Sequence, residues 1–423
     1  MKVFKFGGAS VKSAKAIRNV ASIISLYKGE KLAIVVSAMG KNTNAFEEIT
    51  EALLSKNERM FITLIDERIS FHDTILKELI TEENNPIYGE IRTLFSSLKE
   101  RIDQPIDKVP DYYYSAIVSL GEVLSTKIIN AYLLQEGFNS LWKSAISLIR
   151  TENKYKDANI NWEVTNDLFQ KNLMTEYDEV DVILTQGFMG HNDEGEVTTL
   201  GREGSDFTAG IIAHCCNSES VTIWKDVPGM LNADPKWFDN TIKLDSISFR
   251  EAIELSYYGA SVIHPKTIKP LQNKDIPLFV RSFIDPKEEG TTIHSNTSKD
   301  HLVPSFIFKQ NQLLVSISPK DFSFIGEQNL SDIFLRLSSL EVKINLMQNS
   351  AMSFSILIDE DKVEIKELIA LFDDSYNIKY NETLELITIR HYDDETLERC
   401  LVNKEVLLQQ LTRETARIIV ANK

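Results

Sequence analysis

Near its start the sequence carries a stretch of residue types suited to holding a phosphate group, Lys5-Phe-Gly-Gly-Ala-Ser-Val11. Gly7 and Gly8 have no side chains, so their backbone N–H groups can approach a ligand closely. Ser10 is predicted to lie where the next helix begins, and unpaired N–H groups at a helix start attract anions. Lys5 can add an ammonium group from the end of the preceding strand. The spacing matches neither a Walker loop nor a dinucleotide fingerprint, so a tight strand–helix turn explains the stretch equally well.

Short apolar runs predict the sheet that must position this stretch. Runs without polar alternation suit strands buried on both faces, as in a parallel sheet covered by helices. The runs are Val3–Phe6, Leu32–Ser37, Asp181–Gln186, Val221–Trp224 and Pro277–Arg281. Ser248-Phe-Arg-Glu251 is a capping box that predicts the start of a helix, and Gly259 predicts its end. We therefore predict an α/β fold with a mainly parallel sheet.

The pattern changes at two places along the chain. From about 58 to 101 it predicts long, charge-laced helices broken by Asn84-Asn85-Pro86, a helical excursion that could form a lid or contribute to a dimer. Between about 285 and 310 the sequence is polar and aperiodic, as expected of a surface connection. We therefore predict one domain over 1–300 and a second over 301–423.

The second domain is predicted to have a different architecture. Residues 311–381 give the order βαββαβ of a ferredoxin-like unit, and 382–423 give a truncated second unit, β–α–β. In the first unit, Ile333, Phe334, Leu337 and Leu340 are predicted to line one helix face. The truncated unit is predicted from strands at Leu384–Ile389 and Ala416–Ala421 and a helix within Leu397–Leu411.

Composition narrows the class of protein. Lys and Arg number 46 against 62 Asp and Glu, a net charge of −16, which argues against binding nucleic acid by neutralising phosphates. We see no apolar run of the length that a membrane span needs, and no long apolar stretch of a signal peptide at the N-terminus. Cys215, Cys216 and Cys400 lack metal-ligand spacing and suggest reduced thiols. We expect a cytoplasmic enzyme or small-molecule binder with no metal site of its own.

Six ordered motifs make the sequence resemble the aspartate kinases. The first is Lys5–Val11, with Ala9 where the family most often has Thr. The others are Ser37-Ala-Met-Gly-Lys-Asn-Thr43-Asn, Gly121-Glu122, Gln186-Gly-Phe, Thr199-Leu-Gly-Arg202-Glu-Gly-Ser205-Asp206 and Trp224-Lys-Asp226-Val-Pro-Gly-Met-Leu231-Asn-Ala-Asp234-Pro. Together they cover residues 1 to about 285, with a fainter match beyond. The resemblance implies a three-layer α/β/α amino acid kinase fold followed by an ACT-type, α+β ferredoxin-like region.

The same resemblance implies phosphorylation of the β-carboxylate of L-aspartate by ATP with Mg²⁺, the first step of the pathway to lysine, threonine and methionine. Arg202 suits bidentate binding of a carboxylate, and Glu122 suits pairing with an ammonium group. Ser37, Thr43 and Ser205 would add hydrogen-bonding groups. Taken singly, Arg202 could instead be a surface ion pair and Glu122 a solvated residue before a helix.

Two residues are expected to serve the chemistry itself. A carboxylate is already a nucleophile at neutral pH, so no general base is needed, and catalysis depends on positioning and charge stabilisation. We assign Lys5 to the transferring phosphate, with the amides of Gly7 and Gly8. We expect Asp206 to organise Lys5 rather than to accept a proton.

The segment Trp224–Lys236 resembles the family's nucleotide-binding loop. The residues expected around ATP there are Lys225, Asp226, Leu231 and Lys236. Two departures weaken the match, because Leu231 replaces a frequent Tyr and Ser261 replaces a frequent Lys. These departures predict that ATP binds more weakly than in the family. A lysine at position 261 would then raise the affinity for ATP.

The C-terminal region resembles the ACT domains that sense amino acids in many aspartate kinases. By that resemblance Asn345, Gln348 and Asn349 would contact an effector, lysine or threonine, and the region would form a homodimer. A purely structural dimerisation role is the alternative.

Two other functions stay open. One is a related kinase acting on glutamate, acetylglutamate or a nucleoside monophosphate, which Arg202 with Glu122 disfavours. The other is an amino-acid-sensing binder with a kinase-like body and weak or lost catalysis, supported only by Leu231 and Ser261.

Overall fold

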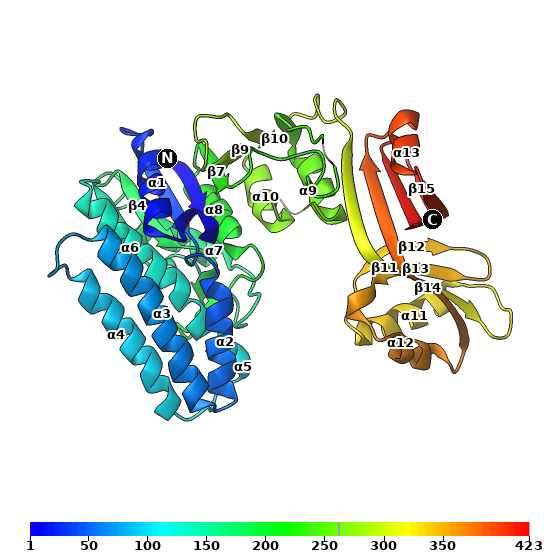
Figure 1. Ribbon diagram of the computed structural model, residues 1–423, viewed down its shortest axis with the longest axis horizontal. Helices are drawn as coiled ribbons and strands as arrows, with labels where there is room; N and C mark the ends of the chain where they lie inside the picture. The colour runs from blue at the N-terminus through cyan, green and yellow to red at the C-terminus, as the bar shows by residue number, and fades with distance from the viewer. Residues whose placement is uncertain (239, 261–262, 423) are drawn as a thin grey trace. The chain divides into compact units, whose positions relative to one another are not determined.

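The computed structural model describes residues 1–238, 240–260 and 263–422 (Figure 1). By its internal contacts the chain divides into two units. The first contains Met1–Met230, Lys243–Ile253 and the stretch ending at Lys299, and the second contains Leu231–Ile242, Glu254–Ala260 and Asp300–Lys423. The predicted boundary at residue 300 stays a prediction, since two earlier stretches also join the second unit.

The first unit is built on an eight-stranded sheet with the order β3-β4-β2-β1-β7-β9-β10-β8. Its strands are β1 (Lys2–Phe6), β2 (Leu32–Val36), β3 (Ser140–Lys143), β4 (Val182–Gln186), β7 (Ser220–Lys225), β8 (Ser246–Ser248), β9 (Leu278–Ser282) and β10 (Thr291–His294). All neighbours pair in parallel except β9 with β10. Every residue of β2 and β4 is buried, and successive side chains point to opposite faces, so both faces are covered. The predicted three-layer α/β/α architecture is confirmed.

Helices fill the outer layers. They are α1 (Ala14–Ser25), α2 (Asn42–Leu54), α3 (Glu58–Leu79), α4 (Ile87–Lys99), α5 (Pro110–Val118), α6 (Leu120–Gln135), α7 (Trp162–Asn172), α8 (Gly204–Cys215), α9 (Phe249–Tyr258) and α10 (Pro265–Gln272). The helix predicted after Ser248 is confirmed as α9, and the Ser248 hydroxyl accepts the Glu251 N–H at 3.0 Å. A small hairpin of β5 (Met189–His191) and β6 (Val197–Thr199) stands apart from the main sheet.

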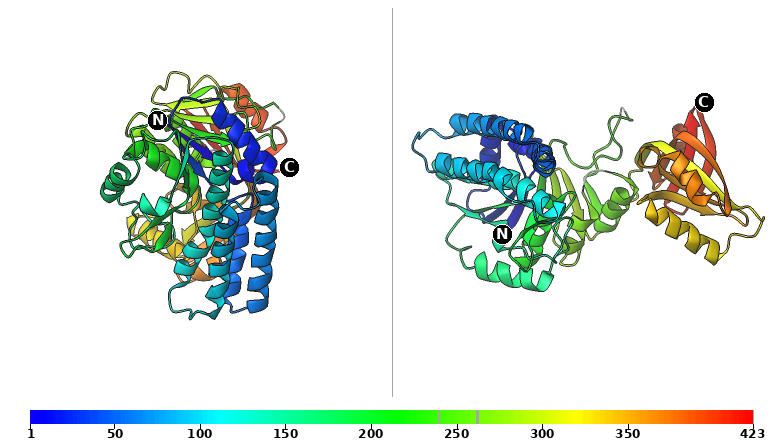
Figure 2. Two further views of the ribbon diagram at one scale, coloured as in Figure 1. Left: turned by 90° about the vertical axis from the view of Figure 1, so that its left-hand side faces the viewer. Right: turned by 90° about the horizontal axis from the view of Figure 1, so that it is seen from below.

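The predicted helical excursion is confirmed as α3 and α4, with the break where Asn84-Asn85-Pro86 was expected. Of the two, α4 packs against both α3 and α6 (Figures 1 and 2). Phe61, Ile65 and Phe95 are buried in the same hydrophobic cluster as the central strands. The excursion is therefore part of the core, where each such aromatic or aliphatic side chain contributes roughly 1.5–3 kcal/mol by burial.

One segment, Pro110–Gln135, is long and apolar enough to cross a membrane by length and composition. It comprises α5 and α6, two helices that we did not predict from the sequence. Of its most apolar 18 residues, 67% are buried inside the protein. It also carries Glu122 in its middle. Burial in the core accounts for its apolar character.

The second unit has a six-stranded antiparallel sheet with the order β12-β13-β11-β14-β16-β15. Its elements are β11 (Ser305–Pro319), α11 (Glu327–Ser339), β12 (Ile344–Asn349), β13 (Phe354–Asp359), α12 (Ile365–Phe372), β14 (Tyr376–Arg390), α13 (Asp394–Cys400), β15 (Lys404–Leu411) and β16 (Thr415–Asn422). The predicted βαββαβ order is confirmed.

Two details of this unit correct the prediction. The helix expected within Leu397–Leu411 ends at Cys400, and Lys404–Leu411 is an edge strand paired with β16. The truncated second unit also contains a strand segment that precedes residue 311 in the sequence. Ser305–Lys309, the first part of β11, pairs with the later part of β14. Such pairing between distant segments leaves no periodic signal within the short stretch 382–423.

The predicted apolar face of α11 is only partly right. Ile333 and Leu337 are buried in the core beneath the sheet, but Phe334 is 41% exposed. Phe334 therefore turns toward the edge of this face and rests against Phe354, whose ring centroid lies 5.6 Å away.

Candidate active site

The carboxyl ends of the central parallel strands meet at one edge of the sheet, because Phe6 is paired with both Val36 and Trp224. Ligand sites of open α/β sheets lie at this edge. The loops that follow β1, β2 and β7 therefore converge there.

The glycine pair after β1 is shaped by packing as well as by ligand access. A Cβ on Gly8 would lie 2.5 Å from the carbonyl oxygen of Gly40 and 2.8 Å from that of Ala38, so the two loops touch backbone to backbone. A Cβ on Gly7 would lie 3.2 Å from the Lys5 ammonium. The glycines thus allow both the contact between loops and the free approach to Lys5.

The placement of Ser10 corrects the prediction. Gly8–Val11 form a 3-10 turn, and α1 begins only at Ala14, where the Ser13 hydroxyl accepts the Ala16 N–H at 3.3 Å. Ser10 therefore lies inside the turn and not at the helix start. The cap at Ser13 was missed because the turn separates it from the strand.

Charges at this end of the site are paired. The Lys5 ammonium lies 2.7 Å from Asp206 Oδ1, and the Lys225 ammonium lies 4.0 Å from Asp206 Oδ2. The Asp206 carboxylate, in the first turn of α8, thus sits between two ammonium groups that come from β1 and β7. This arrangement fixes the position of Lys5.

Beside this ion pair lies a pocket of about 560 Å³, which we call the substrate pocket. It is lined by Lys5, Ser37, Thr43, Glu47, Tyr114, Glu122, Lys156, Asp157, Phe188, Thr199, Gly201, Arg202, Glu203, Gly204, Ser205, Asp206 and Lys225. Every residue predicted to contact the acceptor is among them, although the predictions came from three separate motifs.

Glu122 is buried at the bottom of the pocket with only 2% of its surface exposed. Its Oε1 accepts the Ala38 N–H at 3.3 Å, and Oε2 has no hydrogen-bond partner among the described residues. Burial raises the pKa of Glu122 to about 8, against the lowering effects of backbone hydrogen bonds and of the Lys5 charge. A buried carboxylate with a free oxygen is well suited to receive a cationic group.

The loop before α8 and the first turn of that helix bring Arg202 and Ser205 to the pocket by close backbone packing. A Cβ on Gly187 would lie 2.4 Å from the Ser205 side chain, so only glycine fits there. Arg202 is exposed, and among the described residues it has no carboxylate within ion-pair distance. The guanidinium group is thus available for a ligand.

The predicted site omitted several residues that line the pocket. Phe188 is the last residue of the quoted Gln186-Gly-Phe motif and could have been included. Thr199, Gly201, Glu203 and Gly204 also lie within a quoted motif. Glu47, Tyr114 and Lys156 come from α2, α5 and a loop outside the motifs, and only tertiary packing brings them to the pocket.

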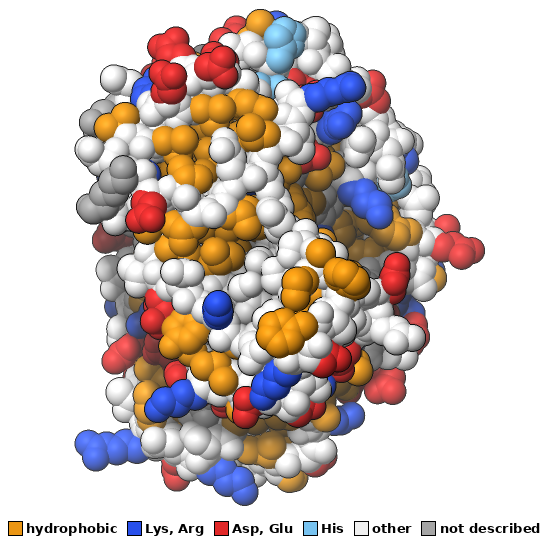
Figure 3. Space-filling view, turned by 90° about the vertical axis from the view of Figure 1, so that its right-hand side faces the viewer, with side chains coloured by type: hydrophobic (Ala, Val, Ile, Leu, Met, Phe, Trp, Pro, Cys, Tyr) orange, Lys and Arg blue, Asp and Glu red, His pale blue; other side chains and the backbone are white. Residues whose placement is uncertain are grey.

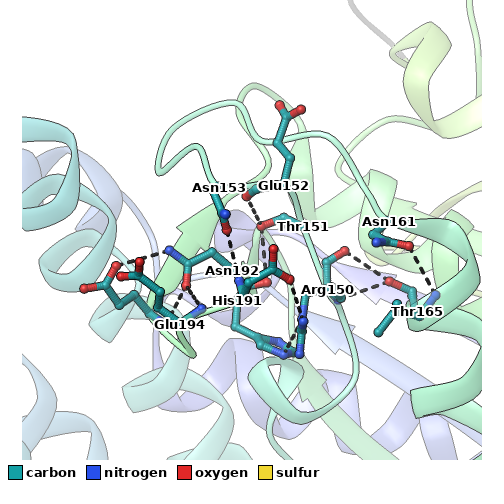
Figure 4. Close-up of polar contacts among 12 residues, drawn as sticks. Arg150, Thr151, Glu152, Asn153, Asn161, Thr165, His191, Asn192 and Glu194 are labelled. Atoms are coloured by element: carbon teal, nitrogen blue, oxygen red, sulfur yellow. Dashed lines mark hydrogen bonds and ion pairs between the residues drawn. The ribbon is translucent and has the colours of Figure 1, made fainter.

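The loop that carries Lys156 is held by a dense polar network (Figure 4). At its start, Arg150 Nε donates to His191 Nε2 at 2.9 Å, and the Thr151 N–H donates to the His191 carbonyl at 2.8 Å. Because the ring nitrogen accepts, His191 is neutral there, and burial lowers its pKa. Asn153 Oδ1 accepts the Asp193 N–H at 3.1 Å, which joins the loop to the β5–β6 hairpin.

The predicted nucleotide residues are divided between the two units. Lys225 ends β7 in the first unit and the exposed Asp226 follows it, whereas Leu231 and Lys236 belong to the second unit. The Lys236 N–H donates to Asp234 Oδ1 at 2.9 Å in an exposed turn. The other departure noted in the sequence, Ser261, lies outside the described residues.

The predicted effector residues do not form one group. The Asn345 side chain is buried and fully used: Oδ1 accepts from Lys309 at 2.8 Å, and Nδ2 donates to Gln312 and to Asp359, each at 2.8 Å. Gln348 and Asn349 are exposed at the end of β12. Asn345 therefore has no polar atom left for an effector in this arrangement.

No group of three or more His, Cys, Asp or Glu side chains among the described residues is placed to hold a metal ion. The three cysteines are unpaired thiols, and burial raises the pKa of each.

Comparison with known proteins agrees with this geometry. Residues 1–282 match the amino acid kinase family. The lysine-sensitive aspartokinase 3 of Escherichia coli is 28% identical over 96% of this chain and 89% of that protein. Aspartokinase 2 of Arabidopsis thaliana chloroplasts is 29% identical over 92% of this chain and 71% of that protein. A bifunctional aspartokinase/homoserine dehydrogenase of Buchnera aphidicola is 29% identical, and the chain spans about half (47%) of its length.

Solved structures share the fold over nearly the whole chain. An aspartate kinase from Clostridium acetobutylicum superposes with a TM-score of 0.82 at 22% identity, covering 99% of this chain and 96% of that one. The E. coli aspartokinase III structure in complex with aspartate and ADP gives 0.79 at 24% identity, with the same coverage. The chain belongs to the amino acid kinase family. Within that family, each of the proteins just named is an aspartokinase.

Proposed function

We propose that this chain is an ATP-dependent aspartate kinase of the cytoplasm, which converts L-aspartate to 4-phospho-L-aspartate. The observation that carries the proposal is the substrate pocket, where the buried, partly unpartnered Glu122 and the unpaired Arg202 flank the Lys5–Asp206 ion pair. An amino acid with a second carboxylate complements this set, since its ammonium matches Glu122 and its carboxylates match the cations.

The proposed reaction is a direct phosphoryl transfer. An oxygen of the β-carboxylate attacks the γ-phosphorus of ATP, the bond from that phosphorus to the bridging oxygen breaks, and ADP leaves. No proton moves, so no general base is required. Lys5 stabilises the negative charge of the phosphoryl oxygens, and Asp206 holds Lys5 in place.

The remaining ligand contacts are proposed by position. Ser37, Thr43 and Ser205 line the pocket and would donate to the acceptor. ATP would lie against Gly7, Gly8, Ser10, Lys225 and Asp226 of the first unit. Mg²⁺ would arrive on the phosphates of ATP.

The experiment that tests the proposal is ADP release by the purified chain with aspartate. Glutamate, acetylglutamate and nucleoside monophosphates serve as the comparison panel. Release with aspartate alone supports the proposal. Release with another acceptor would assign a different member of the family, and aspartate binding without ADP release would leave a binding protein.

We also propose that the second unit makes a homodimer and mediates feedback by lysine or threonine. The E. coli relative is named a lysine-sensitive aspartokinase. Apolar side chains exposed on this unit supply a surface for a second copy: Phe322, Phe324, Leu335, Met347 and Met352. Figure 3 shows a face on which hydrophobic side chains gather between charged ones. Sedimentation of wild type against Phe322→Ser/Phe324→Ser tests the dimer, and activity with millimolar lysine or threonine tests the feedback.

The Asn345 side chain is hydrogen-bonded to Lys309, Gln312 and Asp359. We therefore propose that an effector at β12 would contact Gln348 and Asn349 instead. A flat activity response to both amino acids would leave the second unit with a structural role only.

A further inference from the structure

We infer that Lys156 is a second carboxylate-binding residue of the substrate pocket, which holds the α-carboxylate of the acceptor together with Arg202. The inference rests on the proposed function, and it adds a residue that belongs to none of the motifs.

Lys156 lines the pocket with its ammonium over the face of an aromatic ring. Its ammonium lies 4.3 Å from the ring centroid of Tyr114, and the Tyr114 hydroxyl donates to Glu47 Oε1 at 2.8 Å. Glu47, Tyr114 and Lys156 all line the pocket with Arg202. The hydrogen bond to Glu47 fixes the ring, and the ring in turn favours a cation over its face.

The Tyr114 ring positions the Lys156 ammonium, but no carboxylate in the described part of the chain neutralises its charge. Among the described residues it has no carboxylate within ion-pair distance, and the same is true of Arg202. By contrast, both Lys5 and Lys225 share Asp206 at the phosphate end. The pocket thus has two cations that share Asp206 and two cations, Lys156 and Arg202, with no carboxylate partner among the described residues.

The backbone around Lys156 is fixed before any ligand binds. The Tyr155 carbonyl accepts the Thr199 N–H and the Ser115 hydroxyl, both at 2.7 Å. The Ala158 N–H donates to the Thr199 carbonyl at 2.9 Å. The network of Figure 4 holds the start of the same loop. A cation on a fixed backbone loses little freedom on binding a ligand.

The groups of the acceptor can then be assigned one by one. The β-carboxylate must face Lys5 to meet the phosphoryl group, and the ammonium matches the free oxygen of Glu122. The α-carboxylate remains, and so do the two unpaired cations. Two cations on one carboxylate can serve both of its oxygens, which would favour an α-carboxylate over an α-amide.

The test is Lys156→Met, assayed with aspartate and with aspartate α-amide, whose β-carboxylate is still free to accept the phosphoryl group. With aspartate we expect KM to rise roughly tenfold and kcat to stay within about twofold, as for loss of one charged hydrogen bond to the bound substrate. With the α-amide we expect wild type and variant to have similar KM values. Lys154→Met is the matched control, an exposed lysine of the same loop outside the pocket lining, and should behave as wild type.

A variant of the aromatic ring sharpens the result. Tyr114→Leu removes the ring beneath the Lys156 ammonium and should raise KM for aspartate as Lys156→Met does.

An unchanged KM in Lys156→Met, or an equal penalty on aspartate and its α-amide, would overturn the inference. Absence of ADP release by wild type would instead contradict the proposed function. Calorimetric titration of wild type and Lys156→Met with aspartate would then decide the inference, which requires weaker binding by the variant and fails if the two bind equally or neither binds.

Discussion

The Lys5 ammonium and the Asp206 carboxylate lie 2.7 Å apart, with only 12% and 4% of their side-chain surfaces exposed. They come from the first strand and from α8, which lie far apart in the sequence. Loss of either member of a largely buried pair leaves an uncompensated charge, which costs more than the pair itself contributes.

Replacing Asp206 should therefore damage both activity and stability. In Asp206→Asn we expect kcat to fall about a hundredfold, because Lys5 loses its fixed position, and the free energy of unfolding to fall by about 3 kcal/mol. ADP release and urea unfolding measure the two effects. Asp181→Asn is the control, since its ion pair with Lys31 is longer, 3.6 Å, and half exposed. An Asp206→Asn enzyme with normal kcat would contradict the proposed role.

Aspartate binding should improve as pH rises toward 8. The pKa of Glu122 is raised to about 8 by burial, so at lower pH the carboxyl must lose a proton before it can pair with the ammonium of the acceptor. We expect KM for aspartate to fall by up to about tenfold per pH unit between about pH 6 and 8. Glu122→Gln should bind aspartate weakly and lose this pH dependence. A KM that stays constant over this range in wild type would refute the interpretation.

The same carboxyl should make the protein less stable as pH rises. Its folded pKa, about 8, lies above the ordinary value of 4.5, so the folded state binds more protons than the unfolded state between these values. The stability that protonation provides is present below pH 4.5 and lost as pH rises through 8. Glu122→Gln should therefore gain thermal stability relative to wild type, most clearly at pH 8, in a calorimetric scan. Equal melting temperatures at pH 8 would contradict this.

His72 should have the opposite effect on acid stability. It is buried in α3, its Nδ1 lies 2.7 Å from the Arg68 carbonyl oxygen, and burial lowers its pKa to about 4. Since the unfolded value is 6.5, stability is lost as pH falls from 6.5 to 4, by up to about 3 kcal/mol. In His72→Leu the unfolding free energy should decline less over this range. A parallel decline in wild type and variant would exclude His72 as the cause.

Gly8 should tolerate no side chain. In Gly8→Ala the new Cβ would lie within 2.8 Å of two backbone carbonyl oxygens, so the loop after β2 must move. We expect a loss of about 1–3 kcal/mol of stability and a higher KM for ATP. Gly89→Ala, in α4 with nothing within 4 Å of its Cβ, should be neutral or stabilising by up to about 1 kcal/mol. Equal stability of the two variants would contradict the packing argument.

The sequence by itself determined the fold class and about half of the residues that line the substrate pocket. Unbroken apolar runs identified the buried strands, because a strand covered on both faces needs no polar alternation. Lys5, Glu122 and Arg202 stood in recognisable motifs, and each lines the substrate pocket. These features are local, so residue type and spacing suffice to predict them.

Only the tertiary structure decided what depends on contacts between distant segments. It paired Ser305–Lys309 with β14, turned Asn345 inward to Lys309, and brought Lys156 onto Tyr114 beside Arg202. It also left Glu122 buried with a free oxygen, which makes that carboxylate different from an ordinary glutamate before a helix. A single sequence carries no periodic record of such long-range neighbours, because burial and pairing are set by the packing of the whole unit.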